Sequence, residues 1–494
     1  MSPQAGAAGN AHIGVVGVGH GRYWPQFENL KDEILAKMDV FLDKLRRNGT
    51  SPTCFGLVDS VESAYALVPS LLAADLDVLF VDLLTYATSG TFAVFAQRVR
   101  IPTVLVALQP SRALDYAATT TRTQLLHDDV CSLPEFTGVA RRCGNPVADV
   151  IIGTLADDAP ADEDIARWCR IAAAIRDLRT ARIGLMGHVL EGMLDMHSDP
   201  TAITAAFGCH VVTVEPDELM RHYRAAGEPA LQEMREKILE FFDTPEPGQD
   251  PITRKLSTQD LHIAAEAAVA LEELIAEKRL HGLAYYYEGE EQSDMRTLVS
   301  NLIVGNSMLI SRGVPVSGEF DIKTCIAMLI MDRLGMGGSF AELHPVDFTR
   351  NSVLVGHDGP HHIGIAQGKP VLRSLDRYHG KPGMGASVEF SIRRGPITIL
   401  SITVDHDGCF RFVVAEGEAI AGPTPPTGNT NTHARFGPDI RTFLRDWALA
   451  GPTHHFALGV GHHAKEIVSL AGALGIRATS LIHGVASHAE RVEP

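Results

Sequence analysis

The chain has 494 residues, of which 45% are hydrophobic, and a formal net charge of −17 at pH 7. This length predicts two to four domains with large cores. The acidic balance argues against binding nucleic acid or an anionic membrane through a broad basic face. It fits an enzyme that acts on a neutral small molecule.

The cysteines and the N-terminal segment indicate the expected compartment. Seven cysteines are scattered without a Cys-x-x-Cys pair, which is typical of reduced thiols in the cytoplasm. The segment from Met1 to Asn10 is small and polar, and it lacks the basic and apolar regions of a signal peptide. No apolar run approaches the ~18 residues of a membrane-spanning helix. We therefore expect a cytoplasmic protein without membrane or nucleic-acid partners.

The first region, residues 1–178, alternates short apolar runs with amphipathic segments. Because strands and helices alternate, the region predicts a doubly wound parallel sheet. The predicted strands are 12–18, 53–58, 78–83 and 103–108, and the predicted helices are 27–47, 60–73 and 92–99.

A second alternating region, residues 179–348, predicts another doubly wound parallel domain. Its strands are predicted at 181–187, 211–214 and 282–288, and its helices at 217–223, 228–242 and 258–278. The Pro-rich segment 243–251 reads as a loop inside this domain, and Tyr285, Tyr286 and Tyr287 are assigned to the last strand.

The third region, residues 349–494, has short strands separated by glycine and Asp-Gly turns. This pattern predicts a mainly antiparallel, β-barrel-like domain. Its strands are predicted at 371–375, 386–392, 397–404 and 410–419, followed by a loop at 422–433 and a final α/β piece with a helix at 440–448, a strand at 456–460 and a helix at 464–474. The α/β class of the chain thus comprises two parallel-sheet domains and this third one.

Four groups beside glycine or proline carry the metal-binding chemistry. They are Glu319 in Val316-Ser-Gly-Glu-Phe-Asp321, Glu342 in Gly337-Gly-Ser-Phe-Ala-Glu342, His357 in Val353-Leu-Val-Gly-His357, and the pair His454-His455. Two carboxylates and two imidazoles suit a divalent ion such as Mn²⁺ better than a thiolate zinc site. The groups lie far apart in the sequence, so only the fold can bring them together.

A glycine-rich turn near the N-terminus offers a weaker signal. Val16-Gly-Val-Gly-His-Gly21 follows a predicted strand, but Arg22 occupies the place of the third glycine of a dinucleotide fingerprint. We therefore expect no NAD, and interpret the segment as a tight turn at a sheet end. The acidic run Glu288, Glu290 and Glu291 is interpreted as a solvated loop, and His462-His463 as a helix start.

The order and local sequence of the four groups resemble the L-arabinose isomerase family, within the arabinose/fucose isomerase superfamily. The similar motifs are Gly-Glu-x-Asp-x-Lys-Thr at 318–324, Gly-Gly-Ser-Phe-Ala-Glu at 337–342, Leu-x-Gly-His ending at 357, and Gly-x-x-His-His at 451–455. The resemblance covers most of the chain and is close only around these motifs. It implies that Glu319, Glu342, His357 and His455 bind one Mn²⁺, and that the two glutamates also move the proton.

The resemblance also implies sugar contacts and an assembly. The candidate sugar-binding residues are His20, Tyr23, Trp24, His127, His188 and Tyr287. Members of the family assemble as trimers and pairs of trimers, so a homotrimer or homohexamer with shared active sites is expected. The family spaces its third ligand differently, and His361 and His362 follow His357 closely. Either of them is an alternative to His357.

These residues predict an aldose–ketose isomerase. A carboxylate takes the proton from C2 of an opened sugar, a second group serves the oxygens of an enediol, and the metal stabilises negative charge on O1 and O2. The sugar-contacting loops differ from those of familiar arabinose isomerases, so the aldose itself stays open. A metal-dependent hydrolase or aldolase and a non-catalytic sugar-binding protein are the alternatives.

Overall fold

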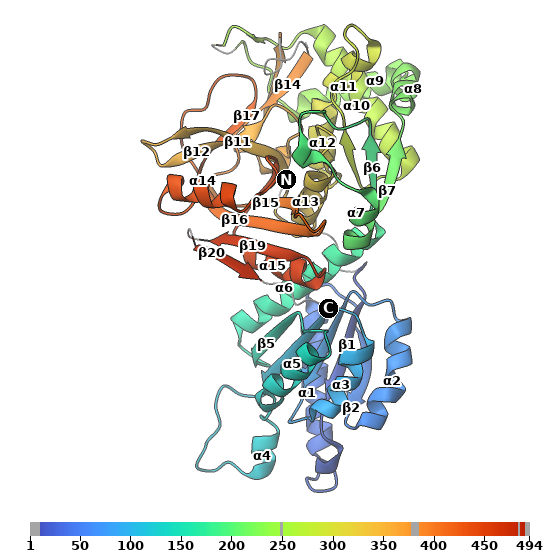
Figure 1. Cartoon of the computed structure of the whole chain (residues 1–494), viewed down its shortest axis with the longest axis vertical. Coiled ribbons are helices and arrows are strands. Elements are labelled where there is room, and N and C mark those ends of the chain that lie inside the picture. The colour runs from blue at the N-terminus through green and yellow to red at the C-terminus, as the bar shows by residue number, and fades with distance from the viewer. Residues whose placement is uncertain (1–9, 248–249, 377–384, 483–484, 490–494) are drawn as a thin grey trace. The chain divides into compact units, whose positions relative to one another are not determined.

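The computed structural model describes residues 10–247, 250–376, 385–482 and 485–489 (Figure 1). They form two compact units, one of residues 10–176 with 472–475 and a larger one of residues 177–471 and 476–489. Residues 1–9, which belong to the N-terminal segment without signal-peptide features, lie outside the described residues. The division into domains at 178/179 and 348/349 stays a prediction.

The first unit is built on a parallel sheet. Its strand order is β2 (Thr53–Val58), β1 (Ile13–Val18), β3 (Val78–Leu83), β4 (Thr103–Gln109) and β5 (Asp149–Thr154). Its helices are α1 (Leu30–Arg47), α2 (Val61–Ala73), α3 (Ser89–Arg98), α4 (Thr121–Leu125), α5 (Leu133–Arg142) and α6 (Ala159–Thr180), with 3₁₀ turns at Gly21–Tyr23 and Val130–Ser132. The predicted parallel α/β architecture is confirmed.

Both faces of this sheet are covered by helices. Residues of α2, α3 and α5 form one apolar cluster with β1, β3 and β4. On the other face, Phe41 of α1 lies against Phe80 of β3, with ring centroids 5.5 Å apart. This arrangement explains why the central strands are buried almost throughout.

The larger unit contains a second parallel sheet, in the order β10 (Val316–Ser317), β9 (Gly282–Tyr285), β6 (Arg182–Met186) and β7 (His210–Val214). Its helices are α7 (Pro200–Phe207), α8 (Pro216–Ala225), α9 (Glu228–Phe241), α10 (Thr258–Lys278), α11 (Asp294–Ser300), α12 (Ile303–Ile310) and α13 (Ile322–Arg333), with a 3₁₀ turn at Leu194–Met196. Helix α13 is buried on all sides, as its apolar sequence requires.

The remainder of this unit is mainly antiparallel. The sheet runs β15 (Gly395–Val404), β18 (Phe456–Val460), β11 (Ser339–Asp347), β12 (Ser352–His357), β17 (Thr430–Arg435), β16 (Phe410–Ile420), β19 (Arg477–Ile482) and β20 (Val485–Ala489). Because β15 also pairs with β16, the strands from β15 to β16 close into a ring. Helices α14 (Ile440–Leu449) and α15 (Ala464–Ala473) and a 3₁₀ turn at Ile363–Ile365 complete the unit.

Three local predictions need correction. The segment 371–392 does not join the ring: β13 (Val371–Leu375) and β14 (Gly385–Glu389) form a separate sheet with β8 (Thr253–Arg254). The predicted loop 422–433 ends in strand β17, which pairs with β12. The sequence did not predict this strand because its residues are mostly polar. Strand β9 stops at Tyr285, so Tyr286 and Tyr287 leave the sheet.

Two further observations bear on the expected compartment. All seven cysteines are free thiols. Within the described ranges, we find no helix with the length and apolar character needed to span a membrane.

Candidate active site

The candidate site lies in the larger unit, at the carboxyl ends of three parallel strands. Strand β10 leads into Glu319, β9 into Tyr286 and Tyr287, and β6 into the loop 187–199. In open α/β sheets this edge is the usual place for ligands, because the loops that follow neighbouring strands converge there.

Glu319 stands in a strained stretch of backbone. Both Glu319 and Phe320 have left-handed backbone angles, with φ of 57° and 63°, a conformation that costs non-glycine residues about 1–3 kcal/mol each. The Phe320 N–H donates to the Tyr285 carbonyl at 2.8 Å, which ties this turn to the end of β9. The turn holds the Glu319 side chain in the interior, where the residue is only 5% exposed.

Three neighbouring strands of the ring carry the other predicted ligands. Strand β11 holds Glu342, which pairs in register with Gly356, next to His357 at the end of β12. On the other side of β11, Ala341 pairs with Phe456, next to His455. The register therefore brings Glu342, His357 and His455 to one level of the ring.

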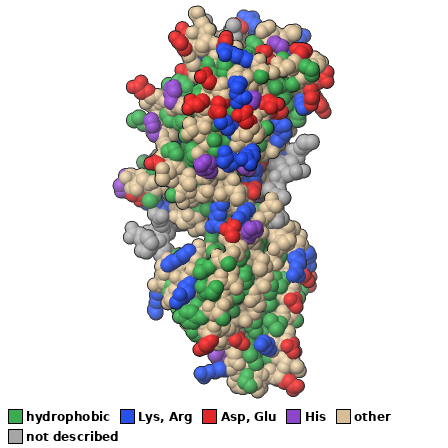
Figure 2. Space-filling view, turned by 90° about the vertical axis from the view of Figure 1, so that its right-hand side faces the viewer, with side chains coloured by type: hydrophobic (Ala, Val, Ile, Leu, Met, Phe, Trp, Pro, Cys, Tyr) green, Lys and Arg blue, Asp and Glu red, His purple; other side chains and the backbone are tan. Residues whose placement is uncertain are grey.

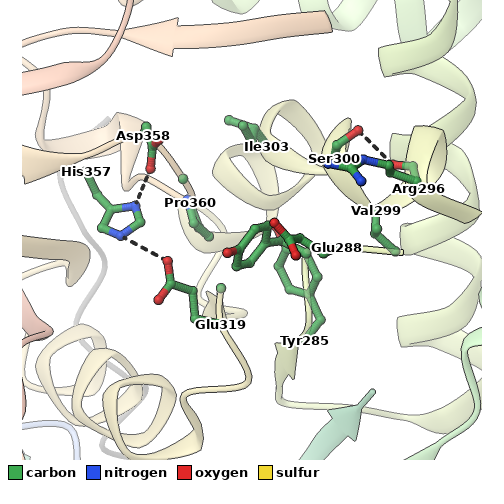
Figure 3. A pocket seen from close by; sticks show the side chains of 13 residues that line it. Tyr285, Glu288, Arg296, Val299, Ser300, Ile303, Glu319, His357, Asp358 and Pro360 are labelled. Atoms are coloured by element: carbon green, nitrogen blue, oxygen red, sulfur yellow. Dashed lines mark hydrogen bonds and ion pairs between the residues drawn. The ribbon is translucent and has the colours of Figure 1, made fainter. Parts of the chain in front are cut away.

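The four predicted ligands lie together. Glu319 Oε1 is 4.0 Å from His357 Nε2, and Glu319 Oε2 is 3.6 Å from His455 Nε2. Figure 3 shows the His357 ring and the Glu319 carboxylate pointing toward one another. Glu342, His357 and His455 each offer a ligand atom within 4.8 Å of the others. Both imidazoles thus lie close to both carboxylates.

Phe340 and two aspartates hold the imidazole rings in place. The buried Phe340 ring contacts His357 and His455, at centroid distances of 4.7 and 4.3 Å. His357 Nδ1 lies 3.3 Å from Asp358 Oδ1, and His455 Nδ1 donates to Asp321 Oδ2 at 3.1 Å. A carboxylate behind each imidazole is the arrangement that orients histidine ligands in metal sites.

The Asp321 carboxylate and the His455 ring form a buried pair. Burial opposes ionisation of Asp321, but the hydrogen bond from His455 and the Lys323 ammonium hold its pKa below the ordinary value. Burial also opposes protonation of His455, but Asp321, followed by Glu319 and Glu342, raises the pKa of the ring. The cluster therefore attracts positive charge.

The donor set fits a divalent ion. In the neutral ring, His455 donates from Nδ1 and its Nε2 presents a lone pair, and Nε2 is buried without a hydrogen-bond partner among the described residues. It faces Glu319 Oε2 at 3.6 Å, too far for a hydrogen bond. Two acceptors facing each other in the interior are destabilising unless a cation lies between them.

His454 forms a second pair that the sequence did not single out. Its Nδ1 donates to Asp195 Oδ2 at 2.7 Å, and its backbone N–H donates to the same oxygen at 3.0 Å. Its Nε2 lies 3.9 Å from Glu319 Oε2, so Glu319, His454 and His455 form another group of potential ligands. No spacing rule could link Asp195, which follows a different strand, to the pair at 454–455.

The two alternatives to His357 lie elsewhere. The His361 ring packs against Phe390, with centroids 5.7 Å apart, and His362 Nε2 lies 3.8 Å from Asp332 Oδ1. Among the described residues, neither histidine belongs to a group of potential metal ligands. Burial lowers the pKa of His361 to about 3, so its ring is neutral.

A pocket opens beside the cluster. Glu319 and His357 line it, together with Tyr285, Tyr287, Glu288, Arg296, Val299, Ser300, Ile303, Gly318, Asp358, Gly359 and Pro360 (Figure 3). Tyr287 is thus the sugar candidate that shares a pocket with predicted ligands. His188 follows β6 and stacks on Tyr286, with ring centroids 4.1 Å apart, outside this pocket lining.

The remaining sugar candidates belong to the first unit. The His20 ring contacts Tyr23, with centroids 4.9 Å apart, and Trp24 Nε1 donates to Asp59 Oδ2 at 2.7 Å. His127 Nε2 lies 2.9 Å from Ser111 Oγ. These candidates follow β1 and β4, at the carboxyl edge of the first sheet, and their role as sugar contacts stays a prediction.

Known proteins match the part of the chain that forms this site. The L-arabinose isomerase C-terminal domain matches residues 337–477, which include the ring strands with Glu342, His357 and His455. The chain is thus similar to the L-arabinose isomerases in this part. The resemblance inferred from the motifs is confirmed.

The similar proteins are named for two different activities. The L-arabinose isomerase of Thermotoga neapolitana is 26% identical over 65% of this chain and 64% of its own length. That of Nocardioides sp. is 24% identical over 81% of this chain and 80% of its own. A sulfoquinovose isomerase of Alkalicoccus urumqiensis is 21% identical over 63% of this chain and 67% of its own. The chain thus spans less than two thirds of the Thermotoga enzyme that it matches.

Proposed function

We propose that this protein is an aldose–ketose isomerase that works with a divalent cation, Mn²⁺ in the first instance. The observation that supports it is the cluster of Glu319, Glu342, His357 and His455, in which two carboxylates lie close to two imidazoles. The names of the relatives, both L-arabinose and sulfoquinovose isomerases, favour the same reaction class.

The cluster can divide the chemistry among its own residues. Glu319, Glu342, His357 and His455 would hold the ion, whose positive charge stabilises negative charge on the sugar oxygens. Glu319 is buried at the pocket wall, and one of its oxygens can accept the proton that leaves carbon. Glu342 is more exposed, and it is suited to proton exchange with the sugar oxygens.

The pocket favours an uncharged sugar segment next to the reaction centre. Glu288, Glu319 and Asp358 bring negative charge to its wall, against a single arginine, Arg296. The apolar faces of the tyrosines, Val299 and Ile303 exclude water, which strengthens the electrostatic interactions of a buried enediol. A pentose of L-arabinose type or a related aldose suits this lining.

A panel of aldoses tests the proposal. L-arabinose, other pentoses, hexoses and sulfoquinovose are incubated with metal-stripped protein and with the same protein after Mn²⁺ is restored. The expected result is that one aldose yields its ketose only in the presence of the metal. Appearance of free acid, alcohol or cleavage products instead of a ketose would favour a hydrolase or aldolase. Sugar binding without turnover would favour a binding protein.

We also propose that the protein assembles as a homotrimer or homohexamer. Hydrophobic side chains gather on the face of the first unit that carries α2 (Figure 2), where Val61, Tyr65 and Leu72 are exposed. The neighbouring strand β2 ends the sheet. An apolar face beside an open sheet edge suits a second copy of the chain. Light scattering that gives a monomer with full activity would contradict this assembly.

Free thiols throughout the chain support a cytoplasmic location.

A further inference from the structure

Two aspartate–histidine pairs converge on one oxygen of Glu319. Asp321 accepts from His455, and Asp195 accepts from the ring and the backbone of His454. In both pairs Nδ1 faces the aspartate, so Nε2 faces Glu319 Oε2, at 3.6 Å from His455 and 3.9 Å from His454. The two rings lie side by side, with centroids 3.9 Å apart.

The two histidines differ in how far solvent reaches them. The His455 side chain is fully buried, whereas the His454 side chain is 37% exposed. His455 also belongs to both groups of potential ligands, and His454 to one. The buried ring is therefore suited to an ion, and the exposed ring to a molecule that enters from solvent.

Asp195 does not hold His454 from a free loop. Its 3₁₀ turn at Leu194–Met196 is attached to α13 by the buried Lys323, whose Nζ donates to the Met196 carbonyl at 3.0 Å and to Ser198 Oγ at 3.1 Å. A buried ammonium is costly unless its hydrogen bonds are satisfied. Lys323 follows Asp321 closely in the segment that also carries Glu319, so one short segment fixes both aspartate–histidine pairs.

The Asp195 carboxylate is stabilised in its ionised form by His454. Burial opposes its ionisation, but the two N–H groups of His454 hold its pKa below the ordinary value. Both hydrogen bonds end on a single oxygen, Oδ2. One acceptor atom therefore fixes the position of the chain at His454 and the direction of its ring together.

We propose that Asp195 is a positioning residue of this site. It holds His454 with Nε2 directed toward Glu319 on the solvent-facing side, where His454 meets the sugar, and Lys323 keeps Asp195 in place. The inference rests on the proposed isomerase function for the identity of the sugar. The orientation of the His454 ring is independent of that function, because it follows from the hydrogen bonds to Asp195.

The test compares Asp195→Ala, Asp195→Asn, His454→Gln and the double variant Asp195→Ala/His454→Gln in the full-length protein. Asp199→Ala is the matched control, because Asp199 lies in the same loop and only caps α7. The readouts are kcat and KM for the aldose that the panel identifies, and the Kd of Mn²⁺ by calorimetry.

We expect Asp195→Ala to lower kcat/KM by about 10–100-fold, the size of effect known for the partner behind a metal-bound histidine. The Kd of Mn²⁺ stays within about twofold, because the proposed ligands of the ion are Glu319, Glu342, His357 and His455. Asp195→Asn keeps an oxygen for both hydrogen bonds and retains most of the activity. Asp195→Ala has no further effect once His454 is Gln, because residues that act through one another are not additive.

Three outcomes would overturn the proposal: unchanged kcat/KM in Asp195→Ala, weakened Mn²⁺ binding in that variant, or additive losses in the double variant. If the wild type converts no aldose, the proposed function fails, and the crystal structure of Asp195→Ala decides the positioning role alone. A His454 ring that turns from Glu319 supports the role, and an unmoved ring refutes it.

Discussion

Glu319 and Glu342 differ in how far water reaches them: the Glu319 side chain is 7% exposed and that of Glu342 26%. If both glutamates move protons, replacing either carboxylate by an amide removes the acid–base group but keeps the shape of the side chain. We expect Glu319→Gln and Glu342→Gln each to lower kcat by about 10²–10⁴-fold. Glu290→Gln, on the exposed loop after β9, is the control and should keep the full rate. A full rate in either site variant would remove that residue from proton transfer.

His357 and His361 provide a matched pair of buried histidines. His357 lies 4.0 Å from Glu319, whereas His361 is neutral and its ring packs against Phe390. His357→Gln should weaken Mn²⁺ binding at least tenfold. His361→Leu should leave the Kd of Mn²⁺ unchanged and nearly keep the melting temperature, because an apolar side chain keeps the packing against Phe390. Calorimetry and thermal melts measure both, and metal loss in His361→Leu alone would reverse the assignment.

At the scale of elements, helix α13 links the site to the fold. Asp321 is its N-cap, accepting from the Thr324 N–H at 3.0 Å, and the same side chain orients His455. Asp321→Asn keeps a good capping group and loses the charge. We expect stability to fall by about 1 kcal/mol or less, while the affinity for Mn²⁺ falls about 10–100-fold. A large loss of stability with unchanged metal binding would show that the residue acts only as a cap.

Sequence patterns predicted the elements whose burial is regular. Strands β1, β3 and β4 are apolar on both faces, and the α10 bounds at Thr258–Lys278 follow from a continuous helical pattern. Strand β17 was missed because its residues are polar and its pairing with β12 is long-range. The motif order also predicted Glu319, Glu342, His357 and His455. Phe340 stands in the motif 337–342 but was not recognised as a contact of the histidines, and Asp195 could not be found in this way, because only the fold brings it to the cluster.

At the scale of the whole molecule, buried carboxylates in the first unit link stability to pH. Burial raises the pKa of Asp82 to about 7, only partly offset by Lys37, and that of Asp129 to about 6. An acid whose pKa is raised by folding binds more protons in the folded state. Its stabilising contribution is complete below the unfolded pKa of about 4 and is lost as the pH rises through about 7.

We therefore expect Asp82→Asn to remove part of this pH dependence. Between pH 5 and 7, the variant should lose less stability than the wild type, by an amount on the order of 1 kcal/mol per pH unit. Urea unfolding followed in the first unit at several pH values measures the slope. Parallel profiles for wild type and variant would contradict a raised pKa at Asp82.

The proposed function requires one ion that is shared by two carboxylates and two imidazoles. Anomalous diffraction at the manganese edge, from crystals of Mn²⁺-loaded protein, tests it most directly. The expected result is one peak with oxygen atoms of Glu319 and Glu342 and ring nitrogens of His357 and His455 at about 2.0–2.6 Å. A peak held by His361 or His362, a peak at Glu319 and His454 without Glu342, or no peak at this cluster would contradict it.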